Sequence, residues 1–198
     1  PTTATNSRVY DHLKSEGFSE EQIIESKLIN KYQDGNTGDF FRNRIMFPIK
    51  NRRGKIAGFG ARSIDNSEPK YINTPKTDVF DKSGILYGLD VSHQSIISER
   101  QAIVVEGYMD VIAAHQHATN NVIASMGTAV TDTQLSQLKS LCDTLILALD
   151  SDTAGKEATS RKLEEILIDS VDKNMMGFNR RIGPIIRRDM VEIKICLL

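Results

Sequence analysis

The chain has 198 residues, of which 39% are hydrophobic and 26% are charged, and its formal net charge is −1. These are ordinary values for a globular protein, and the length allows one large domain or two small ones. No apolar run approaches the roughly 20 residues of a membrane span, and the N-terminal stretch lacks the apolar core of a signal peptide. Cys142 and Cys196 stand far apart without metal-type spacing, which argues against a zinc site or a disulfide framework and favours a reducing, intracellular setting.

The near-zero net charge hides a segregation of basic and acidic residues. Residues 42–88 contain ten Lys and Arg against four Asp and Glu, whereas residues 99–165 contain five against ten. Such an asymmetry favours a polyanion bound by one part and cations bound by the other, with chance variation of surface charge as the alternative.

The first half predicts two short helices, a β-hairpin and a third helix. The expected ranges are 7–16 and 19–29 for the first two helices, 44–49 and 55–59 for the strands, and 89–100 for the last helix. Ser19 is the expected N-cap of the second helix, and the Asn-Arg-Arg-Gly sequence at 51–54 is the expected hairpin turn.

The second half alternates apolar strands with helical stretches. We expect strands at 102–107, 121–127, 144–152 and 191–198, and helices at 108–117, 131–142 and 153–168. This alternation is typical of βαβ units, in which a parallel sheet is covered on both faces by helices. Residues 170–190 show no clear periodicity and predict an extended or loose connection. The predicted fold class is therefore α/β, with a smaller basic mixed α/β subdomain over 1–95 followed by a parallel-sheet domain over 96–198.

Four carboxylates stand close to the ends of two predicted strands. Glu106 follows one strand directly with Asp110 four residues later, while Asp150 and Asp152 end another. Functional groups of parallel sheets gather beyond the carboxyl ends of the strands, and acids gathered there repel one another unless Mg²⁺ or Mn²⁺ neutralises them. Capping and helix-dipole complementation are the alternative, and they are the favoured explanation for Asp110 or Asp152 taken alone.

These residues resemble two signatures of the Toprim family, EGYMD at 106–110 and DSDTAG at 150–155. Further segments closely resemble the RNA-polymerase core of bacterial DnaG-type DNA primases, and the likeness runs from about residue 9 to 168. They are FRNRIMFPI (41–49), GKIAGFGAR (54–62), EPKYINTP (68–75), FDKSGILYGL (80–89), VVEGYMDVIAA (104–114) and ASMGTAVT (124–131).

The resemblance implies roles for the four acids. Glu106 matches the Toprim glutamate, a metal ligand or a general base that helps to deprotonate the attacking 3′-hydroxyl. Asp150 and Asp152 match the metal-binding aspartates, and Asp110 matches a supporting acid. Mg²⁺ or Mn²⁺ is the implied cofactor.

The resemblance also implies basic contacts to template and nucleotide phosphates. Arg62, Lys70 and Lys82 fall on basic positions that the family uses in this way. Arg42 and Arg44, two residues apart, point to the same side if that segment is extended. Solvated surface charge is the alternative for each of them.

The implied function is synthesis of short RNA primers on single-stranded DNA from ribonucleoside triphosphates, in the bacterial cytoplasm and without a membrane partner. The family has a third acidic motif just after the strand that 191–198 resembles, so we expect the chain to be truncated on the C-terminal side of its Toprim domain. In a full-length relative, a C-terminal module absent here would bind a replicative helicase.

Two other functions stay open from the sequence. A Toprim nuclease or topoisomerase shares the acids but cuts DNA, and a topoisomerase needs a nucleophilic tyrosine on a further domain. A non-catalytic Toprim module would bind nucleic acid without metal.

Overall fold

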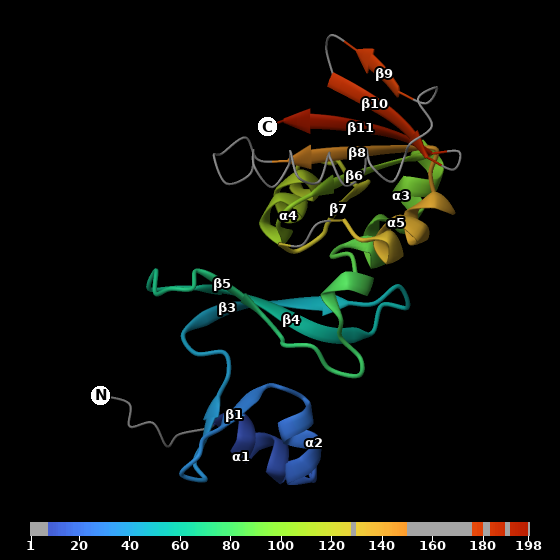
Figure 1. Cartoon of the computed structure of the whole chain (residues 1–198). Coiled ribbons are helices and arrows are strands. Elements are labelled where there is room, and N and C mark those ends of the chain that lie inside the picture. Colours follow the sequence, from blue (N-terminus) through green and yellow to red (C-terminus); the bar gives the residue numbers. More distant parts are fainter. Residues whose placement is uncertain (1–7, 128–129, 150–175, 180–182, 189–190, 198) are drawn as a thin grey trace. The chain divides into compact units, whose positions relative to one another are not determined.

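The computed structural model describes residues 8–127, 130–149, 176–179, 183–188 and 191–197 (Figure 1). The chain forms two compact units, the first made of 1–49 and 56–81 and the second of 50–55 and 82–198. Each unit is described by itself. Within the described ranges, no helix has both the length and the apolar character needed to cross a membrane.

The first unit begins with two short helices, α1 (Arg8–Ser15) and α2 (Glu20–Glu25). Ser19 caps α2 as predicted, because its hydroxyl accepts the N–H of Gln22 at 3.2 Å. The Gln22 side chain in turn accepts the N–H of Ser19 at 2.9 Å, which completes a capping box.

The prediction that the second helix extends to residue 29 is wrong. The helix ends at Glu25, and Lys27 adopts a left-handed backbone conformation with φ of 57°, which stops helical propagation. Ile29–Lys31 instead forms strand β1, which pairs antiparallel with β2 (Thr37–Asp39).

A three-stranded sheet of order β3-β4-β5 follows, with β3 at Arg44–Lys50, β4 at Ile56–Ser63 and β5 at Tyr71–Asn73. The predicted hairpin is thus confirmed, although β4 runs four residues further than the expected strand end at 59. Gly58 is required for packing, since a Cβ atom there would lie 2.9 Å from the ring of Phe80, which is 1% exposed.

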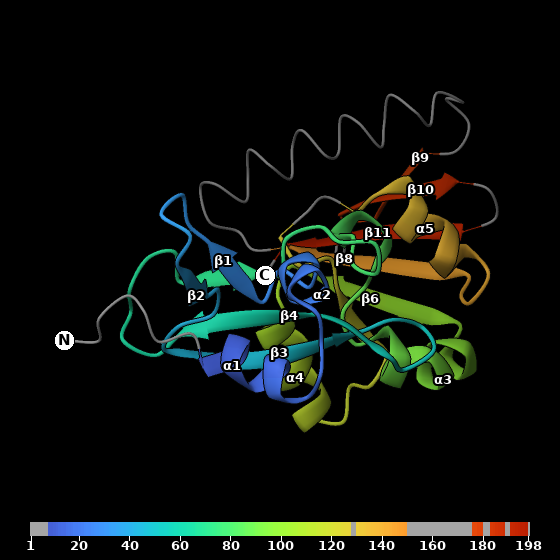
Figure 2. The same ribbon diagram turned by 90° about the horizontal axis from the view of Figure 1, so that it is seen from below.

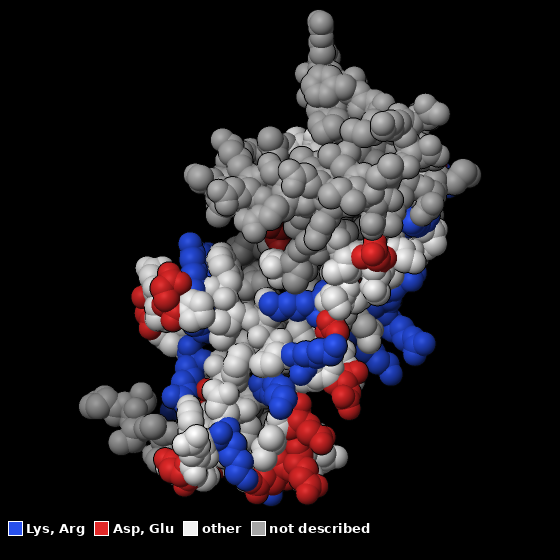
Figure 3. All heavy atoms as spheres, in the orientation of Figure 1, with Lys and Arg blue, Asp and Glu red and all other residues white. Residues whose placement is uncertain are grey.

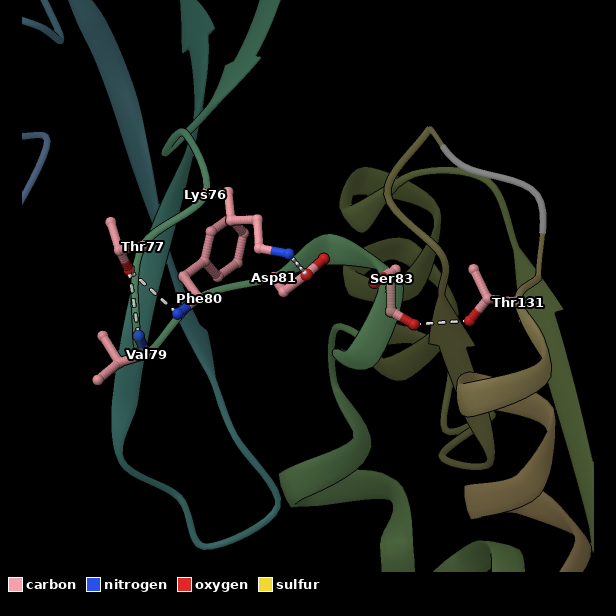
Figure 4. A network of polar contacts seen from close by, with 7 residues as sticks. All are labelled: Lys76, Thr77, Val79, Phe80, Asp81, Ser83 and Thr131. Atoms are coloured by element: carbon pink, nitrogen blue, oxygen red, sulfur yellow. Dashed lines mark hydrogen bonds and ion pairs between the residues drawn. The ribbon is translucent and has the colours of Figure 1, made fainter.

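The segment that carries Phe80 is held by local polar contacts (Figure 4). The Thr77 hydroxyl accepts the N–H groups of Val79 and Phe80 at 3.3 and 3.1 Å. Lys76 pairs with Asp81 at 2.6 Å. These contacts fix the loop after β5, so that the Phe80 ring stays over Gly58.

On the face shown in Figure 3, basic side chains lie around the three-stranded sheet with acidic ones at its left end, and both kinds occur at the two N-terminal helices. The basic residues of the three-stranded sheet and its flanking segments in the first unit are Arg42, Arg44, Arg62, Lys70 and Lys76. The ten basic residues counted over 42–88 are thus divided equally, since the other five, Lys50, Arg52, Arg53, Lys55 and Lys82, belong to the second unit.

The second unit contains a short 3₁₀ helix, η1 (Lys82–Gly84), and three α-helices, α3 (Leu89–Glu99), α4 (Tyr108–Gln116) and α5 (Asp132–Lys139). Each of the three α-helices lies within two or three residues of its predicted range. The helix expected over 153–168 lies outside the described residues.

Six strands form one sheet in the order β7-β6-β8-β11-β10-β9 (Figures 1 and 2). Their bounds are β6 Gln101–Val105, β7 Val122–Ala124, β8 Thr144–Leu149, β9 Met176–Asn179, β10 Gly183–Arg188 and β11 Val191–Leu197. The first four strands of this order are parallel, as predicted. The extended or loose connection expected over 170–190 contains β9 and β10, which pair antiparallel with each other, and β10 also pairs antiparallel with β11.

Alternate residues of the parallel strands bury two separate clusters. One side of the sheet packs Val104, Ile123 and Leu147 against Ile96 of α3 and Leu138 of α5. The opposite side packs a second cluster that includes Val111 of α4; its strand members are Val105, Val122, Ala124 and Ala148. Helices thus cover both faces of the sheet, which confirms the predicted architecture.

Thr131 caps α5 and also connects it to η1. Its hydroxyl accepts the N–H of Gln134 at 3.1 Å and donates to the carbonyl of Ser83 at 2.6 Å (Figure 4). Gln134 is fully buried and donates to the carbonyls of Lys82 and Ile85 at 2.8 and 3.0 Å. Thr131 is therefore both the N-cap of α5 and its link to η1.

Candidate functional site

Glu106 lies at the carboxyl end of a central strand of the second unit. It follows β6, whose last residue Val105 is 7% exposed, and its own side chain is partly exposed. Within the described part of the chain, the Glu106 carboxylate makes no hydrogen bond or ion pair. A carboxylate presented in this way at a strand end is available to a metal ion or a substrate proton.

Asp110 lies in the first turn of α4, three residues beyond Gly107. Its carboxylate accepts the N–H of Gly107 at 3.1 Å, so it caps the helix that begins at Tyr108. This is the capping role that the sequence favoured for Asp110 alone. Because this hydrogen bond joins Gly107 to the first turn of α4, it fixes the backbone turn that directly follows Glu106.

The loop after β7 is attached to the same strand end. The N–H of Gly127 donates to the carbonyl of Glu106 at 3.3 Å, and the N–H of Ser125 donates to the carbonyl of Val105 at 3.3 Å. Gly127 has φ of 77°, a conformation that favours glycine. The loop after the neighbouring strand β7 therefore supports the backbone of Glu106 and Val105.

The other two predicted acids, Asp150 and Asp152, lie outside the described residues. Strand β8 ends at Leu149, immediately before them in the sequence, and β8 pairs in parallel with β6. In the ranges that the structure describes, no group of three or more potential metal ligands is found. The grouping of all four acids stays a prediction.

Arg42 and Arg44 are held within the first unit by hydrogen bonds. Arg42 donates to the carbonyl of Asp39 at 2.9 Å and to the Tyr32 hydroxyl at 3.1 Å. Arg44 donates to the carbonyls of Pro69 and Lys70 at 2.8 and 3.3 Å. Each guanidinium has five N–H donors, so both retain donors for a phosphate while their planes are held in place.

Arg62 and Lys70 lie around one aromatic ring in the first unit. Arg62 pairs with Tyr71 across β4 and β5, and its guanidinium carbon is 5.8 Å from the Tyr71 ring centre. The Lys70 ammonium is 5.9 Å from the same ring, which is 43% exposed. Because Arg44 binds the backbone of Lys70, three of the predicted basic residues form one group around Tyr71.

Lys82 belongs to the second unit, in η1. Partial burial lowers the pKa of its ammonium, since an apolar environment disfavours the charged form. Its backbone carbonyl is bound by Gln134 at 2.8 Å. The five predicted basic residues are thus divided between the two units.

Two contacts were missed by sequence reasoning. Tyr71 was not singled out, although an aromatic residue directly after a lysine in a basic segment is a signal for nucleic-acid binding. His115 was not predicted to make internal contacts, but its Nε2 lies 3.2 Å from the Ser92 hydroxyl and 3.0 Å from the carbonyl of Val122. No sequence pattern indicates the second contact, because it joins α3, α4 and β7.

Comparisons with known families match almost the whole described chain. The family described as DNA primase catalytic core, N-terminal domain, matches residues 2–93, and a Toprim-like family matches residues 103–181. A DNA primase of Clostridium acetobutylicum is 44% identical over 149 residues, which are 75% of this chain and 25% of that protein. The chain therefore spans about a quarter of the length of this relative.

Solved structures agree in fold. A DNA primase domain from Pseudomonas aeruginosa has a TM-score of 0.76 at 34% identity, covering 94% of this chain and 54% of that chain. A DnaG primase catalytic domain bound to single-stranded DNA has a TM-score of 0.75 at 33% identity, covering 94% and 56%.

A parallel sheet covered by helices on both faces, with Glu106 at a strand end and a smaller mixed α/β unit before it in the chain, is the architecture of a Toprim-containing protein. The two matched families and the primase relatives then assign it further: the chain belongs to the bacterial DnaG-type DNA primases, in the region of their catalytic core.

Proposed function

We propose that this chain carries the catalytic core of a primase, which joins ribonucleotides into short RNA primers on a single-stranded DNA template. The observation that carries the proposal is the position of Glu106, unpaired within the described chain and following β6, next to the strand that leads into Asp150. The primase relatives and the DNA-bound primase structure support the same conclusion.

The acids would share the chemistry at this edge of the sheet. Glu106, Asp150 and Asp152 would hold Mg²⁺ or Mn²⁺, hard cations that prefer oxygen ligands. When bound, such ions align a 3′-hydroxyl with a phosphate and stabilise the charge on the leaving group. Asp110, whose carboxylate holds the Gly107 turn, would act as the supporting acid that keeps Glu106 in place.

The reaction forms one phosphodiester bond and breaks one phosphoanhydride bond. The 3′-oxygen of the growing primer attacks the α-phosphorus of a ribonucleoside triphosphate, and pyrophosphate leaves. Glu106 would help to remove the hydroxyl proton. Correct geometry supplies much of the acceleration, so support of the Glu106 backbone by the loop after β7 is consistent with this role.

The basic residues would hold the nucleic acid or the nucleotide by phosphates. Arg62 and Lys70 flank Tyr71, an exposed ring suited to stacking on an unpaired base, while Arg44 fixes the Lys70 backbone. Arg42 and Lys82 would supply further phosphate contacts. In the whole protein, we propose a bacterial cytoplasmic location and a replicative helicase as partner through a module beyond this region.

One assay separates the proposal from its rivals. The chain is incubated with radiolabelled ribonucleotides, single-stranded DNA and Mn²⁺, and the products are resolved on a gel. New short RNA supports primer synthesis. Shortened DNA would instead indicate a Toprim nuclease, and shifted but unchanged DNA a binding module.

A further inference from the structure

The second unit contains a cavity of about 290 Å³ that the primer chemistry does not use. It lies between the hairpin turn that follows β3, the segment that joins η1 to α3, and one residue of α5. Its lining residues are Lys50, Asn51, Arg52, Arg53, Gly84, Ile85, Leu86, Leu89 and Gln137.

The floor of the cavity is aliphatic. Leu86 and Leu89 are each 2% exposed and belong to the main hydrophobic cluster, and Ile85 lies beside them. Gln137 donates to the carbonyl of Gly84 at 2.8 Å, so its amide holds the wall together. No aromatic side chain lines the cavity, so it offers no stacking platform for a nucleic-acid base.

The rim of the cavity is basic and is carried by a fixed turn. The Asn51 side chain accepts the N–H groups of Arg53 and Lys55 at 2.9 and 3.2 Å. The Gly54 N–H donates to the Asn51 carbonyl at 2.8 Å, and the Asn51 N–H donates to the Lys55 carbonyl at 2.9 Å. Arg52 and Arg53 are therefore presented on a turn whose backbone is already ordered.

The rim carries an excess of positive charge. Lys50 lies 3.5 Å from Asp90, which is only 12% exposed, so this lysine is partly neutralised. Arg52 and Arg53 make no ion pair with any described residue, and no carboxylate lines the cavity. Two unneutralised guanidinium groups thus stand over an apolar floor.

The small volume, the aliphatic floor and the basic rim together indicate which kind of ligand fits the cavity. The volume lies near the lower end of the range for small-molecule sites, about 300 Å³, so it suits one anchoring side chain better than a cofactor. A bare phosphate would leave the floor unfilled. An apolar side chain flanked by carboxylates would fill the floor and pair with the guanidinium forks, which match carboxylate geometry.

We propose that this cavity binds an acidic peptide segment of a partner protein, with one apolar side chain on the Leu86–Leu89 floor and carboxylates on Arg52 and Arg53. The proposal is independent of primer synthesis, because none of these residues is assigned to the catalytic or phosphate-binding groups.

The probe is a short capped peptide of Asp and Glu with one central Leu, labelled with a fluorophore. Binding to the whole chain is measured by anisotropy, alongside the same peptide with Ser in place of Leu. We expect Arg52→Ala with Arg53→Ala to weaken binding by about tenfold or more, since each loses a charge-assisted hydrogen bond. We expect the Ser peptide to bind at least about tenfold more weakly, because it leaves the floor exposed to water.

Lys55→Ala is the matched control, since it removes one charge from the same turn but lies outside the cavity lining. It is expected to change the affinity by less than about twofold. In parallel, the amide NMR signals of Gly84, Ile85 and Gln137 are expected to shift when the Leu peptide is added. Because Arg52 and Arg53 are exposed turn residues, the double variant is expected to keep its thermal midpoint.

Four outcomes would overturn the proposal. They are no binding of the Leu peptide, equal binding of the Leu and Ser peptides, unchanged binding in the double arginine variant, and absence of the NMR shifts. The proposal would also be contradicted if a short single-stranded oligonucleotide displaced the labelled peptide at a lower concentration than the unlabelled peptide does. That result would assign the arginines to nucleic acid.

Discussion

The basic side chains of the first unit and the strand-end acid of the second unit are held in different ways. Arg42 and Arg44 are tied to backbone carbonyls and a hydroxyl, and Arg62 and Lys70 lie beside an aromatic ring. Glu106 has no side-chain partner in the described chain, and only its backbone is supported, by Gly127. The basic side chains thus already have partners within the protein, whereas the Glu106 carboxylate has none among the described residues and is available to a ligand. This difference is expected if the first unit binds a polyanion and the second performs chemistry.

The substitution Glu106→Gln tests most strongly whether the second unit performs the chemistry. We expect primer synthesis to fall by about a hundredfold or more, because the amide cannot take up a proton and is a poorer metal ligand. DNA affinity is expected to stay nearly unchanged. Labelled-ribonucleotide incorporation and DNA anisotropy measure the two effects separately.

Glu99→Gln is the matched control, since Glu99 is exposed at the end of α3 and is outside the proposed site. Its activity should equal that of the unchanged chain. If Glu106→Gln kept full primer yield, Glu106 would have no part in the chemistry.

The second prediction concerns the core between α5 and the parallel sheet. Leu138→Ala removes a fully buried side chain of α5 and is expected to lower the free energy of unfolding by about 2–5 kcal/mol. Ile97→Ala on α3, whose side chain is 41% exposed, should cost far less, about 0.5 kcal/mol. Urea denaturation of both variants checks the contrast, and equal costs would contradict the packing described for α5.

The third prediction tests the proposed phosphate contact of one lysine in each unit. Lys70→Ala in the first unit and Lys82→Ala in the second should each reduce the log–log salt slope of single-stranded DNA binding by about 0.7, and together by about 1.4. Lys14→Ala, on an exposed position of α1, is the control. A slope that does not change in a variant would make that lysine ordinary surface charge.

The smallest expected effect is electrostatic and lies in the loop after β4. Hydrogen bonds from the Ser67 side chain and N–H, and from the Asn43 amide at 2.7 Å, lower the pKa of Asp65 to about 2. Because the folded-state pKa is below the unfolded value, this contribution to stability is complete above about pH 4 and is lost as the pH falls toward 2. A carboxyl NMR titration measures it.

Ser67→Ala removes the first of these donors and should move the Asp65 midpoint back toward the ordinary range near 3.9. An unchanged midpoint would mean that the Ser67 hydroxyl does not bind Asp65 in solution. No effect on DNA binding is expected, since Asp65 carries no proposed contact.

The elements with strong local signals could be predicted from the sequence. The parallel strands are short apolar runs that end in glycine or acid, and Ser19 and Thr131 carry side chains that cap helices. The pairing of β10 with β9 and β11 could not be predicted, because it depends on partners elsewhere in the chain and not on periodicity. The end of α2 at Glu25 was missed, since Lys27 is a residue that gives no sequence sign of a left-handed backbone.

The site divides in the same way. Glu106 could be predicted because it follows an apolar strand directly, and Asp110 because it is three residues beyond a glycine turn. The group around Tyr71 could not be assembled, because it needs the antiparallel register of β4 and β5 and the hydrogen bonds of Arg44. The cavity beneath Arg52 and Arg53 depends on a turn that approaches α3 and α5 from far along the chain.

The most direct test of a metal-dependent acid cluster at the edge of this sheet is to measure the thermal midpoint of unfolding with and without Mn²⁺. Mn²⁺ should raise the midpoint of the unchanged chain, since it binds the folded state preferentially. Substitution of Asp150 and Asp152 together by Asn should leave the fold intact and abolish the increase, and Glu106→Gln should diminish it. An undiminished Mn²⁺ response in the double variant would contradict the proposed site.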